Sequence, residues 1–269
     1  MPIVFACAAA HAPGITGWPG VADPAQAERY HGAYRRLGDA LRASRPDVLV
    51  MFTAEHWANF FLDNYPAFCV GRAPNFAGPL EKSINIPHAQ VPGHPETAAA
   101  ILDACFEAGI EPSFSDELRL DHGVMVPMHF LSAHEVALVP IVINALAPPM
   151  PTVRRCFELG RVVGEVARKS KKRIAIMASG GLSHDPGTPS AGTIDQQFDQ
   201  NFLSAFLAND EQRLRAYTDE SIRPAGFGAN EIRNWVAAAG AVPGWRGRHL
   251  AYEAVPAWST GCAMAVLEP

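Results

Sequence analysis

Four short, continuous apolar runs recur along the chain and constrain its fold more than any other feature. They are residues 3–10, 47–54, 136–144 and 173–179. Runs of this length without polar alternation are typical of strands that are buried on both faces, as in a parallel sheet covered by helices. Two further strands, separated by Pro256 and Ser259, are predicted within 251–266. We therefore predict an α/β fold with a mixed, largely parallel central sheet flanked by helices.

Amphipathic segments lie between the apolar runs and predict the helices that cover this sheet. The predicted helices are 24–44, 95–108, 152–171 and 231–239, with another that begins near Thr193. Thr193 and Gln196 match a capping box, and Asn230 is placed to cap the helix that follows it. No internal repeat or linker-like charge run interrupts the pattern, so residues 1–269 are predicted to form a single domain.

Composition and charge exclude several classes of partner. The chain has 22 Lys and Arg against 27 Asp and Glu, a formal net charge of −5, whereas a nucleic-acid surface needs an excess of basic residues. The longest apolar stretch, 136–153, is interrupted by Asn144 and prolines, so we expect no membrane span. Five scattered cysteines without a CxxC pair, and an N-terminal region whose first basic residue is Arg29, predict a cytoplasmic protein.

Three histidines, His11, His56 and His184, each follow a predicted strand. Ligands of open α/β sheets bind outside the carboxyl ends of the strands, so these histidines are expected to converge. Imidazole is the commonest metal ligand and exchanges protons near neutral pH. Two of the three could therefore bind a metal while the third acts as an acid or base. Taken singly, each is more typical of a hydrogen-bonded loop residue.

His122 and Glu231 stand at predicted helix starts and are weaker candidates. If Asp121 caps a helix that runs to about Leu131, His122 lies at its positive end, which favours neutral imidazole. The plainer interpretation makes His122 a solvent-facing residue, Asp121 an ordinary N-cap and Glu231 an ordinary partner of the helix dipole. Glu231 becomes a candidate ligand only if two histidines need a carboxylate, because that set leaves open positions on a metal.

Other functional motifs are absent or incomplete. The sequence contains no G-x-G-x-x-G opening a helix, no G-x-x-x-x-G-K-[ST] and no H-E-x-x-H. The segment 181–185 begins like a nucleophile elbow but lacks its closing Gly, so a serine hydrolase is not favoured. The histidines left out of the predicted site are His31, His88, His94, His129, His134 and His249.

Five short motifs, in order across nearly the whole chain, resemble those of the class III extradiol ring-cleavage dioxygenases. They are His11-Ala12-Pro13-Gly14, Glu55-His56-Trp57, Leu120-Asp121-His122-Gly123, Ser183-His184-Asp185-Pro186 and Asn230-Glu231-Ile232-x-x-Trp235. This family includes the β subunit of protocatechuate 4,5-dioxygenase and the 2,3-dihydroxyphenylpropionate dioxygenases. Each motif alone is unspecific, but five in the same order make the resemblance specific.

The resemblance implies a mononuclear Fe(II) bound by His11, His56 and Glu231. It also implies that His184 is the acid/base residue near the substrate hydroxyl, and that His122 handles or orients a proton. Asp121 and Pro186 fall at the family's supporting positions. Pro13 and Trp57, next to the implied ligands, are expected to line the substrate pocket.

The implied activity is extradiol cleavage of a catechol-type ring, or an aminophenol, with O2 in aromatic catabolism, by a single catalytic domain over residues 1–269. The family implies a homo-oligomer, and some relatives need a small second subunit. Two alternatives stay open: a zinc-dependent hydrolase that uses the same ligands, and a non-catalytic partner or regulatory subunit of the same fold. A carboxylated substrate would want a cation near the metal; Arg72, Lys82 and Arg223 are candidates, although each is more typical of a solvated surface.

Overall fold

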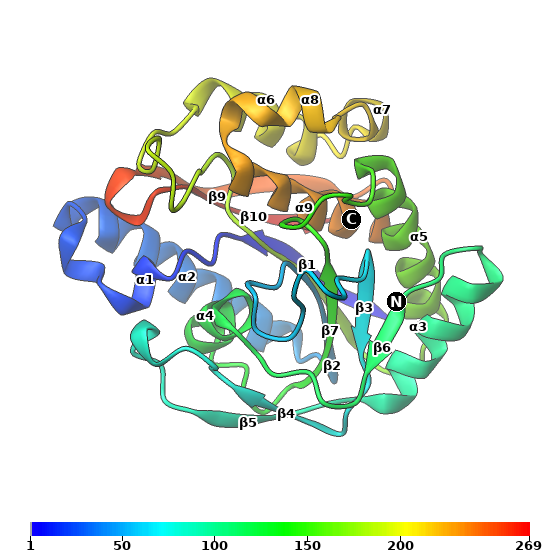
Figure 1. Cartoon of the computed structure of the whole chain (residues 1–269). Helices are drawn as coiled ribbons and strands as arrows, with labels where there is room; N and C mark the ends of the chain where they lie inside the picture. Colours follow the sequence, from blue (N-terminus) through cyan, green and yellow to red (C-terminus); the bar gives the residue numbers. More distant parts are fainter. Residues whose placement is uncertain (1) are drawn as a thin grey trace.

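A computed structural model describes residues 2–269, which are organised around one eight-stranded sheet (Figure 1). Its strands are β1 Ile3–Ala9, β2 Val48–Thr53, β3 Phe68–Gly71, β6 Ser113–Ser115, β7 Ala137–Ile143, β8 Ile174–Ser179, β9 Arg246–Val255 and β10 Thr260–Glu268. They lie in the order β6-β3-β7-β2-β8-β1-β10-β9. A second, two-stranded sheet pairs β4, Asn75–Gly78, with β5, Ala89–Pro92.

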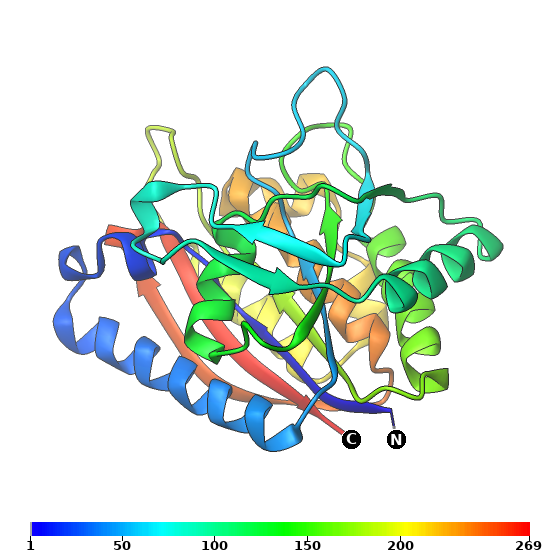
Figure 2. The same cartoon turned by 90° about the horizontal axis from the view of Figure 1, so that it is seen from below.

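The centre of the large sheet is parallel and its flanks are mixed. Strands β7, β2, β8 and β1 run parallel to one another, whereas β10 pairs antiparallel with both β1 and β9. The four apolar runs of the sequence form this parallel core, and nearly every residue in them is buried. The start of β1 and the end of β10 lie side by side (Figure 2). The predicted mixed, largely parallel fold is therefore confirmed.

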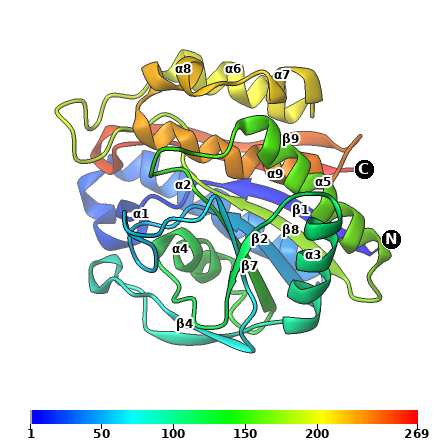
Figure 3. The ribbon, with the colours of Figure 1, turned by 45° about the vertical axis from the view of Figure 1, so that its right-hand side comes forward.

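Helices cover both faces of the sheet. The helices are α1 Gly14–Gly17, α2 Pro24–Ser44, α3 Pro95–Glu107, α4 His122–Leu131, α5 Val153–Lys169, α6 Gln196–Leu207, α7 Glu211–Arg215, α8 Asp219–Ile222 and α9 Ile232–Ala241. One apolar core joins α3, α5, α6 and α9 to one face, and a second joins α2 and α4 to the other. Figure 3 shows these helices on opposite sides of the strands. No helix within residues 2–269 has the length and apolarity to cross a bilayer.

Two predicted helix caps are wrong. Helix α6 begins at Gln196 and is capped by Asp195, which accepts a 2.9 Å hydrogen bond from the Phe198 N–H, so the proposed Thr193 capping box does not form. Asn230 does not cap α9, because it already lies in a 3-10 helix, η4, Phe227–Glu231. Its side-chain oxygen instead accepts a 2.6 Å bond from the buried Arg233 guanidinium.

Several short elements had no counterpart in the sequence prediction. They are α1, β3, β4, β5, β6, α7 and α8, each three to five residues long. Segments this short carry too few residues for a helical or strand period to stand out. The loop between β2 and β3 projects from the molecule (Figure 2).

Helices α5 and α9 approach each other closely because two glycines face the second helix. A Cβ atom on Gly160 would overlap the carbonyl of Ala237, and one on Gly164 would overlap that of Ala241. Only a residue without a Cβ atom allows the two helix backbones to come this close. Since α9 begins directly after Glu231, the packing of α9 against α5 also helps to place that carboxylate.

We expect Gly160→Ala to lower the free energy of unfolding by about 1–3 kcal/mol through overpacking, although alanine favours helices. The matched control is Gly32→Ala in α2, where the added Cβ meets nothing nearer than 3.5 Å. That control should be neutral or stabilising by up to about 1 kcal/mol. Urea unfolding of both variants measures the difference. Equal stabilities would contradict the close helix contact.

Candidate metal centre and active-site cavity

Three neighbouring parallel strands end in one row and bring the predicted histidines together. In the sheet, Thr53 at the end of β2 pairs with Ser179 at the end of β8, and Ser179 pairs with Ala9 at the end of β1. The loops that leave these three ends carry His56, His184 and His11. The convergence is thus a direct result of parallel register.

His11 is held in one ring orientation by Ser179. The imidazole Nδ1 lies 2.8 Å from the Ser179 hydroxyl, whose own proton is donated to the Gly123 carbonyl at 2.5 Å. A serine hydroxyl has one proton to give, so it accepts from His11, and Nδ1 carries the hydrogen. The Nε2 atom is then the unprotonated nitrogen, and it faces Glu231 Oε1 at 3.3 Å.

His56 is held in the same way by Asp121. The Asp121 Oδ2 atom accepts hydrogen bonds from the His56 backbone N–H at 2.8 Å and from Nδ1 at 3.0 Å. The other carboxylate oxygen caps α4 by accepting from the Gly123 N–H. A carboxylate that accepts from Nδ1 leaves Nε2 free for a ligand role. That nitrogen lies 3.1 Å from Glu231 Oε1.

The loop behind His56 is organised around the buried carboxylate of Glu55. It accepts hydrogen bonds from the backbone N–H groups of Trp57, Ala58, Asn59 and Phe60. Burial raises the pKa of Glu55, which these backbone bonds oppose. The Trp57 backbone adopts a φ of 59°, a conformation uncommon outside glycine that is held here by these bonds. The loop therefore presents His56 from a rigid turn.

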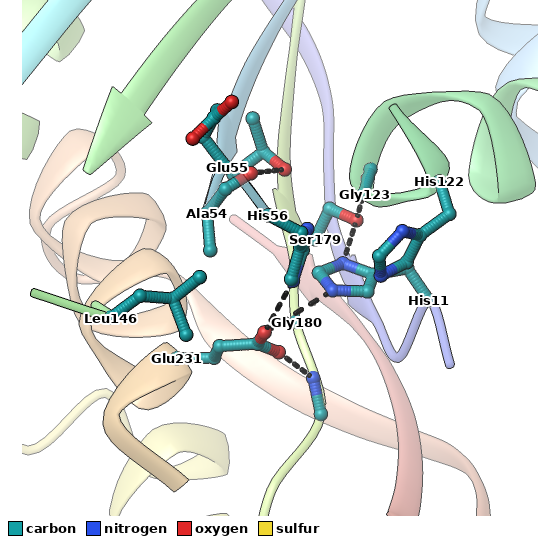
Figure 4. A network of polar contacts seen from close by, with 12 residues as sticks. His11, Ala54, Glu55, His56, His122, Gly123, Leu146, Ser179, Gly180 and Glu231 are labelled. Atoms are coloured by element: carbon teal, nitrogen blue, oxygen red, sulfur yellow. Dashed lines mark hydrogen bonds and ion pairs between the residues drawn. The ribbon is translucent and has the colours of Figure 1, made fainter. Parts of the chain in front are cut away.

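Glu231 is buried at the point where the imidazoles meet (Figure 4). Its Oε2 atom accepts a 2.6 Å hydrogen bond from the Gly181 N–H, which leaves Oε1 directed at His11 and His56. Helix α9 is fastened beside it, since the Trp235 indole donates to the Gly180 carbonyl at 2.9 Å and Asn234 donates to the Ser179 carbonyl at 2.8 Å. The carboxylate is thus placed by both α9 and the end of β8.

The electrostatics of this cluster favour a bound positive charge. Burial would raise the pKa of Glu231, but the imidazoles of His11 and His184 hold it well below its usual range. Burial would lower the pKa of His56, but the carboxylates of Asp121 and Glu231 raise it to about 10. Two buried acids around imidazoles call for a cation, whether a proton or a metal ion.

His184 and His122 lie at the edge of the same cluster. His184 Nδ1 lies 2.8 Å from the Leu182 carbonyl, so it carries the hydrogen, and Nε2 lies 3.8 Å from Glu231 Oε1. His122 Nδ1 lies 2.7 Å from Glu81 Oε1, and its ring centroid is 3.9 Å from that of His56. Burial lowers the pKa of both imidazoles, so both are neutral near pH 7.

A cavity of about 320 Å³ opens onto these groups. His11, His56, His122, His184 and Glu231 all line it, together with Pro13 and Pro186. The rest of its wall is formed by Ala12, Trp18, Gly181, Ala257, Trp258, Ser259 and Thr260. The predicted supporting residue Asp121 and the predicted pocket residue Trp57 are not part of this wall.

Asp121 sits behind His56, outside the cavity wall. Trp57 is 41% exposed and packs edge-to-face against Tyr65, so it does not contribute to the described lining of the cavity.

The three candidate cations for a carboxylated substrate also lie away from this cavity. Arg72 pairs with Asp116 at 2.8 Å, and Lys82 lines a separate cavity together with Arg119 and His88. Arg223 stands in the short 3-10 helix η3, Arg223–Ala225, and is exposed. None of the three is among the residues described as lining the cavity around Glu231.

Several residues around the site were missed by sequence reasoning. Ser179, Glu81 and Trp258 contact or line the site, yet each stands in a segment that carries no motif. Ser179 ends a predicted strand, and strand-end position is the one signal that could have singled it out.

The donor set fits a metal ion. Two imidazole Nε2 atoms with their hydrogens on Nδ1, and one carboxylate oxygen, face a single point beside a cavity. The ligand atoms of His11, His56 and His122 also lie within 4.8 Å of one another. Histidines whose outer nitrogens donate to a hydroxyl or carboxylate are typical of metal sites.

The sequence matches the family described as "Catalytic LigB subunit of aromatic ring-opening dioxygenase" over residues 6–263. The chain belongs to this family. As a LigB-family protein it is an aromatic ring-opening dioxygenase of the extradiol class, an oxidoreductase with a catalytic metal. The match is to the catalytic subunit, which disfavours both the hydrolase and the non-catalytic alternatives.

Related proteins are similar to this chain along nearly the whole length of both sequences. The chain is 28% identical to a 2,3-dihydroxyphenylpropionate/2,3-dihydroxicinnamic acid 1,2-dioxygenase of Photorhabdus laumondii, over 93% of this chain and 94% of that protein. It is 29% identical to the protein of that name from Cupriavidus necator, over 100% of this chain and 99% of the other. An uncharacterized Escherichia coli K12 protein, JW3007, shares the fold, with a TM-score of 0.59, 15% identity, and 89% and 92% of the two chains covered.

We expect Asp121→Asn to weaken metal binding by about 10–100-fold, because an uncharged amide no longer orients and polarises His56. Asparagine remains a good N-cap, so α4 should keep its start. Chelator competition measures the affinity. Asp116→Asn, which alters an exposed acid paired with Arg72, is the control and should bind metal normally. Equal affinities in the two variants would remove Asp121 from the metal centre.

Proposed function

We propose that the chain binds Fe(II) through His11, His56 and Glu231 and uses it to open a catechol-type ring beside the diol with O2. The observation that carries this proposal is the position of Glu231 Oε1, 3.3 Å from His11 Nε2 and 3.1 Å from His56 Nε2, at the wall of a cavity. Two histidines and one carboxylate are the ligand set of non-haem iron oxygenases, which leave positions open for substrate and O2.

When bound, iron would pass electrons between an aromatic diol and O2. Zinc is redox-inert and would not do so. The protein supplies the orientation of its ligands. Ser179 and Asp121 keep a hydrogen on Nδ1 of His11 and His56, so a metal would bind at Nε2 of each ring. At His56 it would replace the proton that the Asp121 and Glu231 carboxylates favour. The Gly181 N–H holds the second oxygen of Glu231, so the carboxylate is fixed before the metal arrives.

His184 is proposed as the acid/base residue. Its Nδ1 hydrogen is committed to the Leu182 carbonyl, and its unprotonated Nε2 is directed at the Glu231 side of the cavity. A neutral buried imidazole can accept a hydroxyl proton from a bound diol and return it later to an oxygen of the opening ring. The lowered pKa of His184, caused chiefly by burial, keeps it in this accepting form near pH 7.

His122 is proposed as a second proton-handling or orienting group. Glu81 Oε1 accepts from its Nδ1, and its ring stands against His56 and His11 at centroid distances of 3.9 and 5.4 Å. The position at the start of α4 adds a positive dipole end, which favours the neutral imidazole. His122 Nε2 is then free to accept a hydrogen bond from a substrate oxygen.

The cavity suits a flat aromatic ring. Pro13, Pro186, Trp18 and Trp258 offer apolar surface on its wall, and the imidazoles and Glu231 provide its polar end. We propose a small aromatic diol or aminophenol as substrate. The relatives named above act on dihydroxyphenyl acids, which makes such compounds the first to test.

We further propose a cytoplasmic homo-oligomer with a single catalytic domain over residues 1–269, with or without a small second subunit. All five cysteines are free and buried, and burial raises the pKa of Cys156 to about 12. Buried protonated thiols are consistent with a reducing compartment. Light scattering of the purified chain would measure its oligomeric state.

We expect His184→Ala to lower kcat by about 10²–10⁴-fold with iron still bound, because it removes proton transfer and no ligand. His11→Ala and Glu231→Ala should instead lose the metal. Oxygen consumption and iron content after anaerobic loading separate the two outcomes. The control is His249→Ala, which alters an exposed histidine of β9 and should leave both measurements unchanged. Full turnover by His184→Ala would exclude the proposed role.

We expect the chain loaded anaerobically with Fe(II) to consume O2 when given catechols or aminophenols, with the visible absorption of a ring-opened product. The zinc-loaded chain should consume none, because zinc does not pass electrons. Ester or amide hydrolysis by the zinc form, without O2 uptake by the iron form, would support the hydrolase alternative. The absence of metal binding and of both activities would support a non-catalytic subunit.

A further inference from the structure

A fully buried carboxylate lies behind the turn that carries His184. Asp199 of α6 is 0% exposed and accepts three hydrogen bonds. Its Oδ1 accepts from the Ser183 backbone N–H at 2.7 Å. Its Oδ2 accepts from the Ser183 hydroxyl at 2.9 Å and from the Tyr252 hydroxyl at 2.7 Å. Two of the three donors therefore belong to the residue directly before His184.

The remaining contacts of this turn come from β10 and η4. Leu182 N–H donates to the Gly261 carbonyl at 3.0 Å, and Gly261 N–H donates to the Ser183 carbonyl at 2.9 Å. Gly228 N–H donates to the His184 carbonyl at 2.9 Å, and the His184 ring lies so close to Gly228 that a Cβ there would overlap it. Asp199 is the acidic side chain that holds Ser183, whereas Glu231 accepts from Gly181 earlier in the same turn.

Gly261 leaves the space that Asp199 occupies. A Cβ at this position would overlap Asp199 Oδ2 and would lie 3.3 Å from the Ser183 hydroxyl. The carboxylate thus fits between a glycine of β10, the hydroxyl of Tyr252 on β9 and the Ser183 turn. Any side chain at Gly261 would push Asp199 or the Ser183 turn away from β10. The glycine therefore lets the turn pack at a fixed distance from the sheet.

We propose that Asp199 is a positioning residue for ring cleavage, which fixes the Ser183 turn and thereby the place of His184 in the cavity. The inference rests on the acid/base role proposed above for His184. A proton acceptor displaced by about 1 Å can cost about 10²-fold in rate, because proton transfer needs hydrogen-bond distance. Without Asp199, the buried Ser183 N–H would have no partner, and the turn would move to find one.

This role is separable from metal binding. Asp199 does not contact His11, His56 or Glu231 in any of the hydrogen bonds or ion pairs found among residues 2–269. Gly181, earlier in the turn, does hold Glu231. Metal content therefore reports whether a change at Asp199 stays local to His184 or spreads to the ligand.

The test compares Asp199→Ala with Asp199→Asn at pH 8, well above the Asp199 pKa, which burial raises to about 6. Asp199→Ala should lower kcat by about 10²-fold, with KM and iron content unchanged. Asp199→Asn should restore most of kcat, because its amide oxygen can accept from Ser183 N–H while its NH2 donates to the two hydroxyls.

The matched control is Asp195→Ala on the same helix. Asp195 caps α6 and makes no hydrogen bond to Ser183 or Tyr252 among residues 2–269, so this variant should lose stability while keeping kcat. If Asp199→Ala does not fold, Ser183→Ala replaces it. This variant keeps the backbone bond to Asp199 Oδ1 and removes the hydroxyl bond to Oδ2, so it should lower kcat by a smaller factor at unchanged KM. Where both single variants fold, the double variant should lose no more kcat than Asp199→Ala alone, because Asp199→Ala already removes the Ser183 hydroxyl bond.

Three results would overturn the inference: unchanged kcat in Asp199→Ala or Ser183→Ala, loss of iron in parallel with activity, or failure of Asp199→Asn to restore kcat. Failure of the proposed function looks different. In that case, the iron-loaded parent protein itself would consume no O2 with any catechol or aminophenol, and His184→Ala would change nothing.

Discussion

The meeting of one buried carboxylate with the imidazoles of His11 and His56 is the interaction on which the rest of this structure depends. Burying an ionised acid is costly unless charge and hydrogen bonds compensate. One oxygen of Glu231 accepts a hydrogen bond from the Gly181 N–H, and the other faces the Nε2 atoms of His11 and His56. Each surrounding element therefore has to deliver a group to one point, and the parallel strand ends do so by register.

Distant packing contributes to this meeting. Gly160 and Gly164 let α5 approach the backbone of α9, and α9 in turn begins directly after Glu231. Trp235 and Asn234 then fasten the first turn of α9 to the end of β8. A change in the helix interface can thus alter the candidate metal centre without replacing any of its side chains, because a close-packed interior transmits strain.

A second layer of acids and hydroxyls orients each histidine. Hydrogen bonds to Nδ1 orient three of them: Ser179 with His11, Asp121 with His56, and Glu81 with His122. Asp199 acts on His184 through Ser183. All four histidines share one arrangement. A hydrogen bond to Nδ1, or a fixed turn before the residue, leaves Nε2 directed at the cavity. Such orienting groups reduce the reorganisation that substrate and metal binding would otherwise require.

Sequence reasoning was strongest for the parallel core, because strands buried on both faces stand out as continuous apolar runs. It also selected His11, His56 and His184, because strand ends are visible in such a pattern. It failed at the Thr193 and Asn230 caps, where 3-10 geometry and an alternative aspartate changed the helix starts. Glu81 and Asp199 had no sequence signal, and Ser179 had only its strand-end position, since their partners are 41, 16 and 168 residues away.

The sequence by itself determined the layered α/β architecture and the set of histidines available at its strand ends. Only the tertiary structure decided which nitrogen of each ring faces the cavity, that Glu231 joins them, and that Trp57 stays outside. The physical reason is the separation along the chain of the residues that set each property. Hydrophobic periodicity is a local property of the chain, whereas a ligand cluster and its tautomers depend on hydrogen bonds between segments brought together by folding.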